Sequence, residues 1–172
     1  MRIMGVVLTG VGLAAAWGCS DPAHVAAPVS RYQMIMELPV GIEVTHSPNP
    51  AKAMPGGRSG YPYTWLYKTS VRALTQPLTI EEFGCFHLVS GQWQFSNYTG
   101  QPFTTSDFAE WYSCPDARLQ PGAEVSDPNN WSGSQTLQTG KKIWYFVGVD
   151  ASGKRWRGSA VVEEIGAVDE RK

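Results

Sequence analysis

The chain has 172 residues, of which 42% are hydrophobic and 17% charged, and its formal net charge is −1 at pH 7. This length suits one domain with a hydrophobic core of its own. A charge this close to zero excludes the usual basic nucleic-acid-binding protein, which needs excess Lys and Arg to neutralise phosphates. The aromatic content of 12% argues against a disordered chain, and 18 Gly with 12 Pro predict frequent turns between strands.

The N-terminal residues predict an export signal. Arg2 precedes an uncharged apolar run, Ile3 to Ala16, that ends in small residues just before Cys19. The run is shorter than the roughly 20 residues that cross a bilayer. Residues 1–18 are therefore predicted to be a signal peptide rather than a transmembrane helix.

The segment LAAAWGC, which ends at Cys19, resembles the lipobox of bacterial lipoproteins. The resemblance implies that Cys19 is acylated and becomes the N-terminus of the mature chain, with ordinary cleavage near Cys19 as the alternative. It also implies a lipid-anchored protein of the cell envelope that faces the periplasm or the cell surface. Ser20 after the cysteine, in place of Asp, is similar to the outer-membrane pattern of Gram-negative lipoproteins.

Two further segments precede the main body of the chain. Residues 19–30 are small and Pro-containing without periodicity, which predicts a flexible tether. Residues 31–60 are predicted to form a β-arm and a linker. The strand of this arm is expected within 31–45, where β-formers are enriched, and the linker at 46–60, which holds three Pro and three Gly.

Residues 61–165 alternate in the way that predicts a β-sandwich domain, followed by a polar tail at 166–172. The expected strands are 61–70, 78–89, 92–98, 141–149 and 154–164. The last two form a hairpin around the turn Asp150–Gly153, and apolar residues on both faces of 141–149 predict a central strand.

A single short helix is expected at 104–113, followed by an irregular crossing at 116–131. Asp107 and Glu110 are spaced as in a capping box, while Phe108, Trp111 and Tyr112 recur on one helical face. These elements together predict an immunoglobulin-like or fibronectin-like β-sandwich with one short helix, with a small β-barrel as the alternative. Such folds host many unrelated functions.

Cys85 and Cys114 remain once Cys19 is assigned to the leader, and an exported chain permits disulfides. We predict that they pair, closing a loop that stabilises the fold by about 3 to 4 kcal/mol. Cys85 and His87 would share one face of a strand, but one Cys-x-His pair supplies too few ligands for zinc. No metal and no cofactor is predicted.

Alternation places Tyr61, Tyr63, Trp65 and Tyr67 in a row on one face of a strand. The row is expected to pack into the core, or alternatively to form an exposed platform that stacks sugars or a partner's apolar surface. Trp131 is added to this candidate binding surface, together with Tyr61, Tyr63 and Trp65.

A basic cluster forms the second part of the candidate surface. Lys154, Arg155 and Arg157 are interleaved with Trp156, and the hairpin is expected to bring them beside Lys141–Lys142. Such a cluster is either a solvated strand edge that prevents edge-to-edge pairing or a docking patch for an anionic surface.

The acids of the chain suggest a third, catalytic interpretation. Glu81 and Glu82 are adjacent on a predicted strand, so they should point to opposite faces unless a bulge turns one out. A small hydrolase could use acids such as Glu82, Asp107 or Glu110.

We rank the functions as follows. The first is a non-catalytic envelope lipoprotein whose sandwich binds a protein partner or scaffolds an assembly. A carbohydrate-binding module that uses exposed aromatics is the alternative, and the carboxylate-dependent hydrolase is the second alternative.

Overall fold

A computed structural model describes residues 29–55, 58 and 60–168, so the predicted leader, Cys19 and most of the tether lie outside the described residues. In chain order the elements are α1 (Arg31–Met36), β1 (Ile42–Ser47), β2 (Ala51–Pro55), β3 (Tyr63–Ala73), β4 (Leu78–Val89), β5 (Gln92–Phe95), β6 (Phe103–Thr104), α2 (Thr105–Trp111), β7 (Arg118–Leu119), β8 (Val125–Ser134), β9 (Gly140–Val149) and β10 (Arg155–Val168). None of the described helices is long and apolar enough to cross a membrane.

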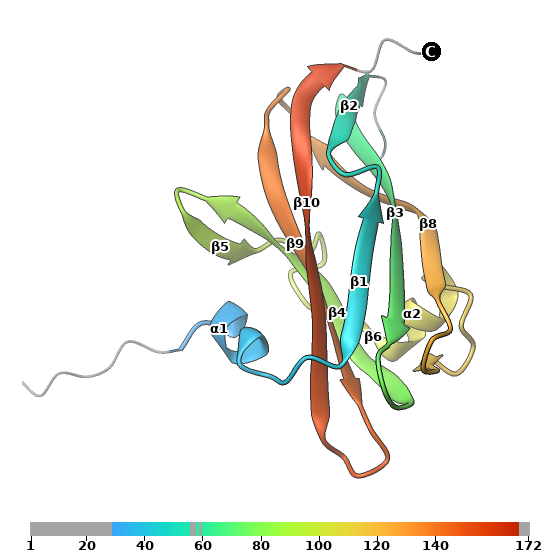
Figure 1. Cartoon of the computed structure of the whole chain (residues 1–172). Coiled ribbons are helices and arrows are strands. Elements are labelled where there is room, and N and C mark those ends of the chain that lie inside the picture. Colours follow the sequence, from blue (N-terminus) through green and yellow to red (C-terminus); the bar gives the residue numbers. More distant parts are fainter. Residues whose placement is uncertain (1–28, 56–57, 59, 169–172) are drawn as a thin grey trace, which may run out of the picture.

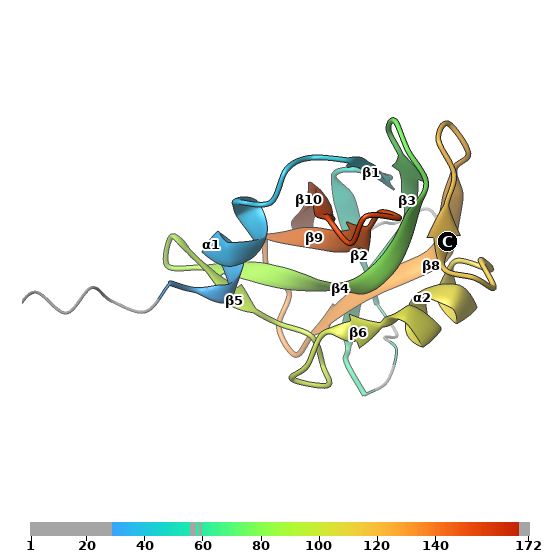
Figure 2. The same ribbon diagram turned by 90° about the horizontal axis from the view of Figure 1, so that it is seen from below.

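The strands form two packed layers joined at one side (Figures 1 and 2). In one layer β3 pairs antiparallel with β8 along one edge and with β1 and β2 along the other. In the other layer β9 lies between β10 and β4, and the far edge of β4 carries β5, β6 and β7. Parallel pairing of β2 with β10 joins the layers. The predicted β-sandwich is confirmed, and the barrel alternative is wrong because the sheet does not close.

Aromatic side chains fill the space between the layers. Trp65 and Tyr67 of β3 are only 1% and 2% exposed, and the Tyr67 hydroxyl accepts a 2.8 Å hydrogen bond from Nε1 of Trp144 on β9. Phe83 of β4 is fully buried, and five rings have centroids between 5.1 and 6.0 Å from its own. Much of the aromatic surplus of the sequence therefore lies in the core.

A second apolar cluster lies on the outer face of β4 and β9, beneath α1. Ile35 of α1 packs there with Phe86, Ile143, Tyr145 and Val147. The helix thus covers the face of β9 that points away from the core, which is why β9 is buried on both faces as predicted.

The prediction of a strand across 31–45 is wrong for its first part, which forms α1. Ser30 Oγ accepts the amide of Gln33 at 3.2 Å, and Gln33 Oε1 accepts the amide of Ser30 at 2.9 Å. This capping box satisfies two backbone donors at the helix start. The motif Ser30-x-x-Gln33 was readable in the sequence, whereas the enrichment in β-formers was misleading.

Two segments predicted as irregular contain strands. The linker at 46–60 holds β2, whose Ala51 and Ala53 are fully buried between β3 and β10. The crossing at 116–131 holds β7 and the first part of β8, which pairs with β3 through a register shift between Tyr67 and Thr69. Pairing with distant strands overrides the turn-like Pro, Gly and Asn content of both segments.

The remaining elements agree with the prediction. β4, β9, β10 and α2 form where expected and β5 ends at Phe95 instead of 98, while the capping box of α2 joins Thr104 with Asp107 rather than Asp107 with Glu110. β10 continues to Val168, so the first part of the predicted tail at 166–172 is a strand.

Side chains bridge the seam between β1 and β10. At one end Gly158 allows β10 to lie close to β1. Any other residue there would clash, because its Cβ would lie 2.5 Å from the Ile42 carbonyl oxygen. Further along, His46 of β1 contacts Thr69 Oγ1 through Nδ1 at 3.0 Å and the Ala160 carbonyl through Nε2 at 3.2 Å. Asn130 already donates to Thr69 Oγ1 at 2.8 Å. The hydroxyl proton of Thr69 therefore goes to Nδ1, and a neutral His46 donates from Nε2.

Burial lowers the pKa of His46 from 6.5 to about 4. The unfolded chain binds the proton more readily, so this contribution to stability is complete above pH 6.5 and is lost as the pH falls toward 4. We expect the loss between pH 7 and pH 4 to be about 3 kcal/mol. Urea unfolding of the wild type and of His46→Gln at both pH values measures it. The same pH dependence in both proteins would contradict the assignment.

Candidate functional site

The predicted aromatic row divides between core and surface. Trp65 and Tyr67 are buried, whereas Tyr61 and Tyr63 are half-buried, so the row does not form a continuous platform. The rings of Tyr61 and Trp131 meet edge to face, with centroids 6.1 Å apart and an interplanar angle of 61°. Because the two rings are not coplanar, they do not offer the flat surface on which a sugar ring stacks.

The predicted basic cluster does not assemble. The hairpin register places Lys141 opposite Glu163 and Lys142 opposite Val162, at the other end from Arg155–Arg157. Arg157 instead donates from Nε to the carbonyls of Met36 and Leu38, at 3.1 and 3.0 Å. Arg157 therefore fastens the end of α1 to β10.

The hairpin's other members are likewise engaged. Trp156 lies against Gly41, and its Nε1 donates to Asp150 Oδ2 at 2.9 Å. Lys154 Nζ lies 4.2 Å from the centroid of the Trp156 ring, a cation–π contact. These contacts order the hairpin, and they leave no dense basic patch at its edge.

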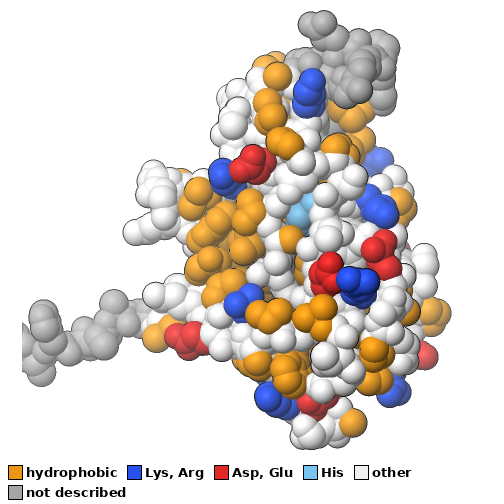
Figure 3. Space-filling model, in the orientation of Figure 1, with side chains coloured by type: hydrophobic (Ala, Val, Ile, Leu, Met, Phe, Trp, Pro, Cys, Tyr) orange, Lys and Arg blue, Asp and Glu red, His pale blue; other side chains and the backbone are white. Residues whose placement is uncertain are grey.

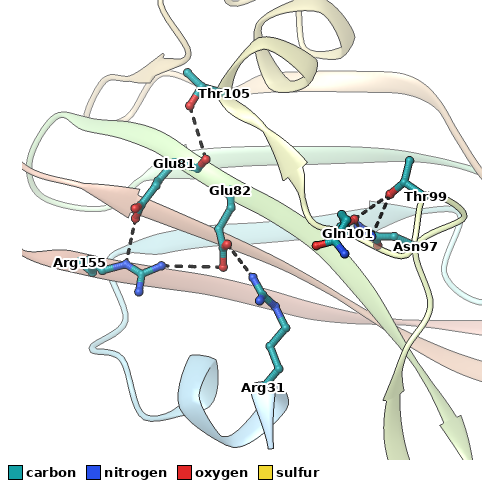
Figure 4. A network of polar contacts seen from close by, with 8 residues as sticks. All are labelled: Arg31, Glu81, Glu82, Asn97, Thr99, Gln101, Thr105 and Arg155. Atoms are coloured by element: carbon teal, nitrogen blue, oxygen red, sulfur yellow. Dashed lines mark hydrogen bonds and ion pairs between the residues drawn. The ribbon is translucent and has the colours of Figure 1, made fainter.

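Glu81 and Glu82 form an ion-pair network with two arginines (Figure 4). Arg155 Nε donates to Glu81 Oε2 at 2.9 Å, and Arg155 Nη2 lies 3.8 Å from Glu82 Oε1. Arg31 at the start of α1 donates to Glu82 Oε2 at 2.6 Å. The network links β4, β10 and α1.

The expectation that Glu81 and Glu82 point to opposite faces is wrong. A register shift between Ile80 and Glu82 bulges β4 against β9, and this turns both carboxylates toward Arg155. A bulge was one outcome the sequence allowed. Of the other candidate acids, Asp107 caps α2, and Glu110 is exposed on it.

The predicted disulfide is not present, since Cys85 and Cys114 are free cysteines. Cys85 Sγ lies 3.5 Å from Ser96 Oγ, while Cys114 Sγ faces the Arg118 carbonyl oxygen at 3.7 Å. The thiols therefore have different partners. Burial is the main cause that raises the pKa of Cys85, which keeps it a protonated thiol.

A buried acid that the sequence analysis did not single out lies near Cys85. Glu164 of β10 is 2% exposed, accepts a hydrogen bond from Ser132 Oγ, and lies 3.9 Å from Lys142 Nζ. Burial, and then the charge of Glu164, raise the pKa of Tyr67 well above 10. Strand parity could have found this group, since Glu164 shares a face with the core residue Val162.

His87 lies near this buried acid but does not complete a metal site. Burial and then the charge of Lys142 lower the pKa of His87. Among the residues that the structure describes, no three His, Cys, Asp or Glu side chains gather closely enough to hold a metal ion. His46 binds protein groups with both ring nitrogens, and His24 lies outside the described residues.

Two surfaces remain as candidate sites, and α1 and β5 of the first lie on the other side of the molecule from the labelled part of β8 in both ribbon views (Figures 1 and 2). The α1–β5 surface consists of half-buried Tyr32, Met36, Leu38, Trp93, Phe95 and Val161 with exposed Met34. Figure 3 shows hydrophobic side chains gathered over this region. The β8 edge consists of residues 130–134 with the Tyr61–Trp131 pair on its outer face.

Neither a protein-family model nor a curated protein matches the sequence. Among solved structures, a Bordetella pertussis protein crystallised under the provisional name ApaA is similar at a TM-score of 0.43 and 14% identity. The match covers 78% of this chain and 98% of the other. A likeness of this degree carries no conclusion about function.

Proposed function

We propose that the chain is a non-catalytic, lipid-anchored protein of the cell envelope that binds a protein partner along the β8 edge. The observation that carries the proposal is that β8 lies at the edge of its sheet. Among the described strands it pairs with β3 alone, and within it the Trp131 amide donates to Asn130 Oδ1 at 2.8 Å. Residues 130–134 run opposite 63–67 without a register shift.

An edge strand offers backbone donors and acceptors to a strand from another chain. Pro128 and the register shift at Tyr67/Thr69 interrupt the first half of β8, so the proposed pairing is confined to 130–134. Trp131 and Tyr61 stand beside this segment on the outer face, half-exposed. Trp and Tyr are enriched among the residues that dominate binding energy at protein interfaces.

The contacts of the other candidate residues favour this function over the two alternatives. A hydrolase needs carboxylates that can reach substrate, but Glu82 pairs with both Arg31 and Arg155. A sugar platform needs exposed coplanar rings, whereas Trp65 and Tyr67 are buried and Tyr61 meets Trp131 edge to face. The anchor is supported by the lipobox-like segment that ends at Cys19.

Retrieval of the partner tests the proposal. We expect the tagged chain to capture one protein reproducibly from detergent-solubilised envelope, and Trp131→Ala to reduce the captured amount about tenfold or more, because the variant removes the largest side chain beside the free edge. Tyr98→Ala is the matched control, since Tyr98 is an aromatic residue with 78% exposure in a different loop. Quantitative mass spectrometry gives the amounts.

Thermal unfolding separates a lost interface from a lost fold, and Trp131→Phe provides a milder change at the same position. Equal capture by the wild type and a folded Trp131→Ala variant would exclude the β8 edge as the interface. Capture of no protein by the wild type would contradict partner binding altogether.

A further inference from the structure

We infer that the α1–β5 surface rests on the phospholipid headgroup region of the membrane that holds the lipid anchor. The inference deepens the proposed function and rests on its lipid-anchored part. The β8 edge is formed by other elements and lies outside the proposed membrane-facing surface.

The first argument is the short span between the proposed anchor and the surface. Val29 begins the described chain and α1 begins at Arg31, ten and twelve residues after Cys19. Ten residues span about 35 Å at most when fully extended. An acyl chain on Cys19 would therefore keep Val29 within about 35 Å of the bilayer, which leaves the α1–β5 surface within reach of the headgroups.

The second argument is the chemistry of the surface. Tyr32 stacks on Trp93, with ring centroids 5.9 Å apart and an interplanar angle of 22°. Both rings are half-buried, and Tyr and Trp favour the membrane interface because each has an apolar body and a polar tip. Met34 of α1 and Val29 just before the helix are 52% and 56% exposed. These apolar side chains gain free energy when they leave water.

The third argument is the charge at the border of the surface. Arg31 lies over the Phe95 ring, with Cζ 5.7 Å from the centroid, and its side chain is 38% exposed. Lys141 at the opposite border is half-exposed and pairs with Glu163 at 2.7 Å. Long cationic side chains reach lipid phosphates while their stems lie along apolar surface. Both cations are paired with carboxylates, Arg31 with Glu82 and Lys141 with Glu163, so the border carries charges of both signs, which suit a zwitterionic headgroup layer.

Tryptophan fluorescence with brominated lipids tests the inference. The full chain is purified from the membrane fraction and reconstituted into vesicles of phosphatidylethanolamine and phosphatidylglycerol that carry bromine on the acyl chains. We expect quenching of the wild type, loss of most of that quenching in Trp93→Phe, and retention in Trp131→Phe, which removes a ring outside the α1–β5 surface. Vesicles without bromine provide the reference intensity for each protein.

The possible results distinguish failure of the membrane-facing surface from failure of the lipid anchor. A chain that sediments with the vesicles but is quenched equally with and without Trp93 overturns the membrane-facing surface and leaves the lipid anchor standing. A purified chain whose mass shows no acyl group on Cys19, and which leaves the membrane in high salt, overturns the anchor and the inference together.

Discussion

Phe83→Ala is expected to destabilise the protein by about 3 to 5 kcal/mol, the largest effect of any single core truncation considered. Phe83 is fully buried between the layers, and its ring contacts come from β6, α2, the residue after α2, and β9. Truncation would open a cavity among rings that are themselves packed against other residues. These rings cannot move far enough to fill the cavity, so most of the lost packing energy is not recovered. Urea unfolding at pH 7 measures the change in unfolding free energy.

Tyr98→Ala is the matched control for this prediction. Tyr98 touches the same cluster through Phe103, with centroids 5.5 Å apart, but is 78% exposed. Its loss is expected to cost under about 1 kcal/mol. Similar losses for the two variants would show that Phe83 does not occupy the centre of a tightly packed core.

Glu164→Gln is expected to cost about 3 kcal/mol, although the two side chains have nearly the same shape. The change leaves Lys142, whose side chain is 14% exposed, without its anionic partner inside the sandwich. Removing one partner of a buried ion pair destabilises the fold by more than the intact pair stabilises it, because the remaining charge is left buried without a counter-charge. Unfolding by urea at pH 7 and low salt measures the loss.

Glu163→Gln, one residue earlier, is the control. Glu163 pairs with Lys141 at 2.7 Å, but both side chains are about half exposed, so the loss is expected to stay below about 1 kcal/mol. The double variant Lys142→Met with Glu164→Gln should recover part of the loss because it removes the stranded charge. Equal effects of Glu163→Gln and Glu164→Gln would contradict the buried-pair account.

The local pattern of apolar residues was sufficient to predict the two central strands of one layer. β4 alternates between buried and exposed residues in its first part, β9 is apolar on both faces, and both strands form where expected. By contrast, β2 ends in Pro55 and β8 contains Pro, Gly and Asn, and these strands are ordered by pairing, β2 with β10 and β3 and β8 with β3. Such long-range pairing leaves no mark on the local pattern, so neither strand could be found from composition.

The candidate sites were less predictable because they depend on distances between separate elements. A one-residue bulge brings Glu81 and Glu82 to the same arginine, against simple alternation. The thiols of Cys85 and Cys114 were assigned to each other by counting, but each faces a different neighbour. The α1–β5 surface depends on a helix in a segment whose enrichment in β-formers predicts a strand.

A photoreactive amino acid placed at three positions in living cells tests the central claim most directly, namely a lipid-anchored sandwich that meets its partner at β8. Substitutions at Trp131, Met34 and Tyr98 sample the β8 edge, the α1–β5 surface and an exposed loop. We predict a defined protein adduct from position 131, lipid adducts from position 34 and neither from position 98. Protein adducts from position 98 with none from position 131 would contradict the account.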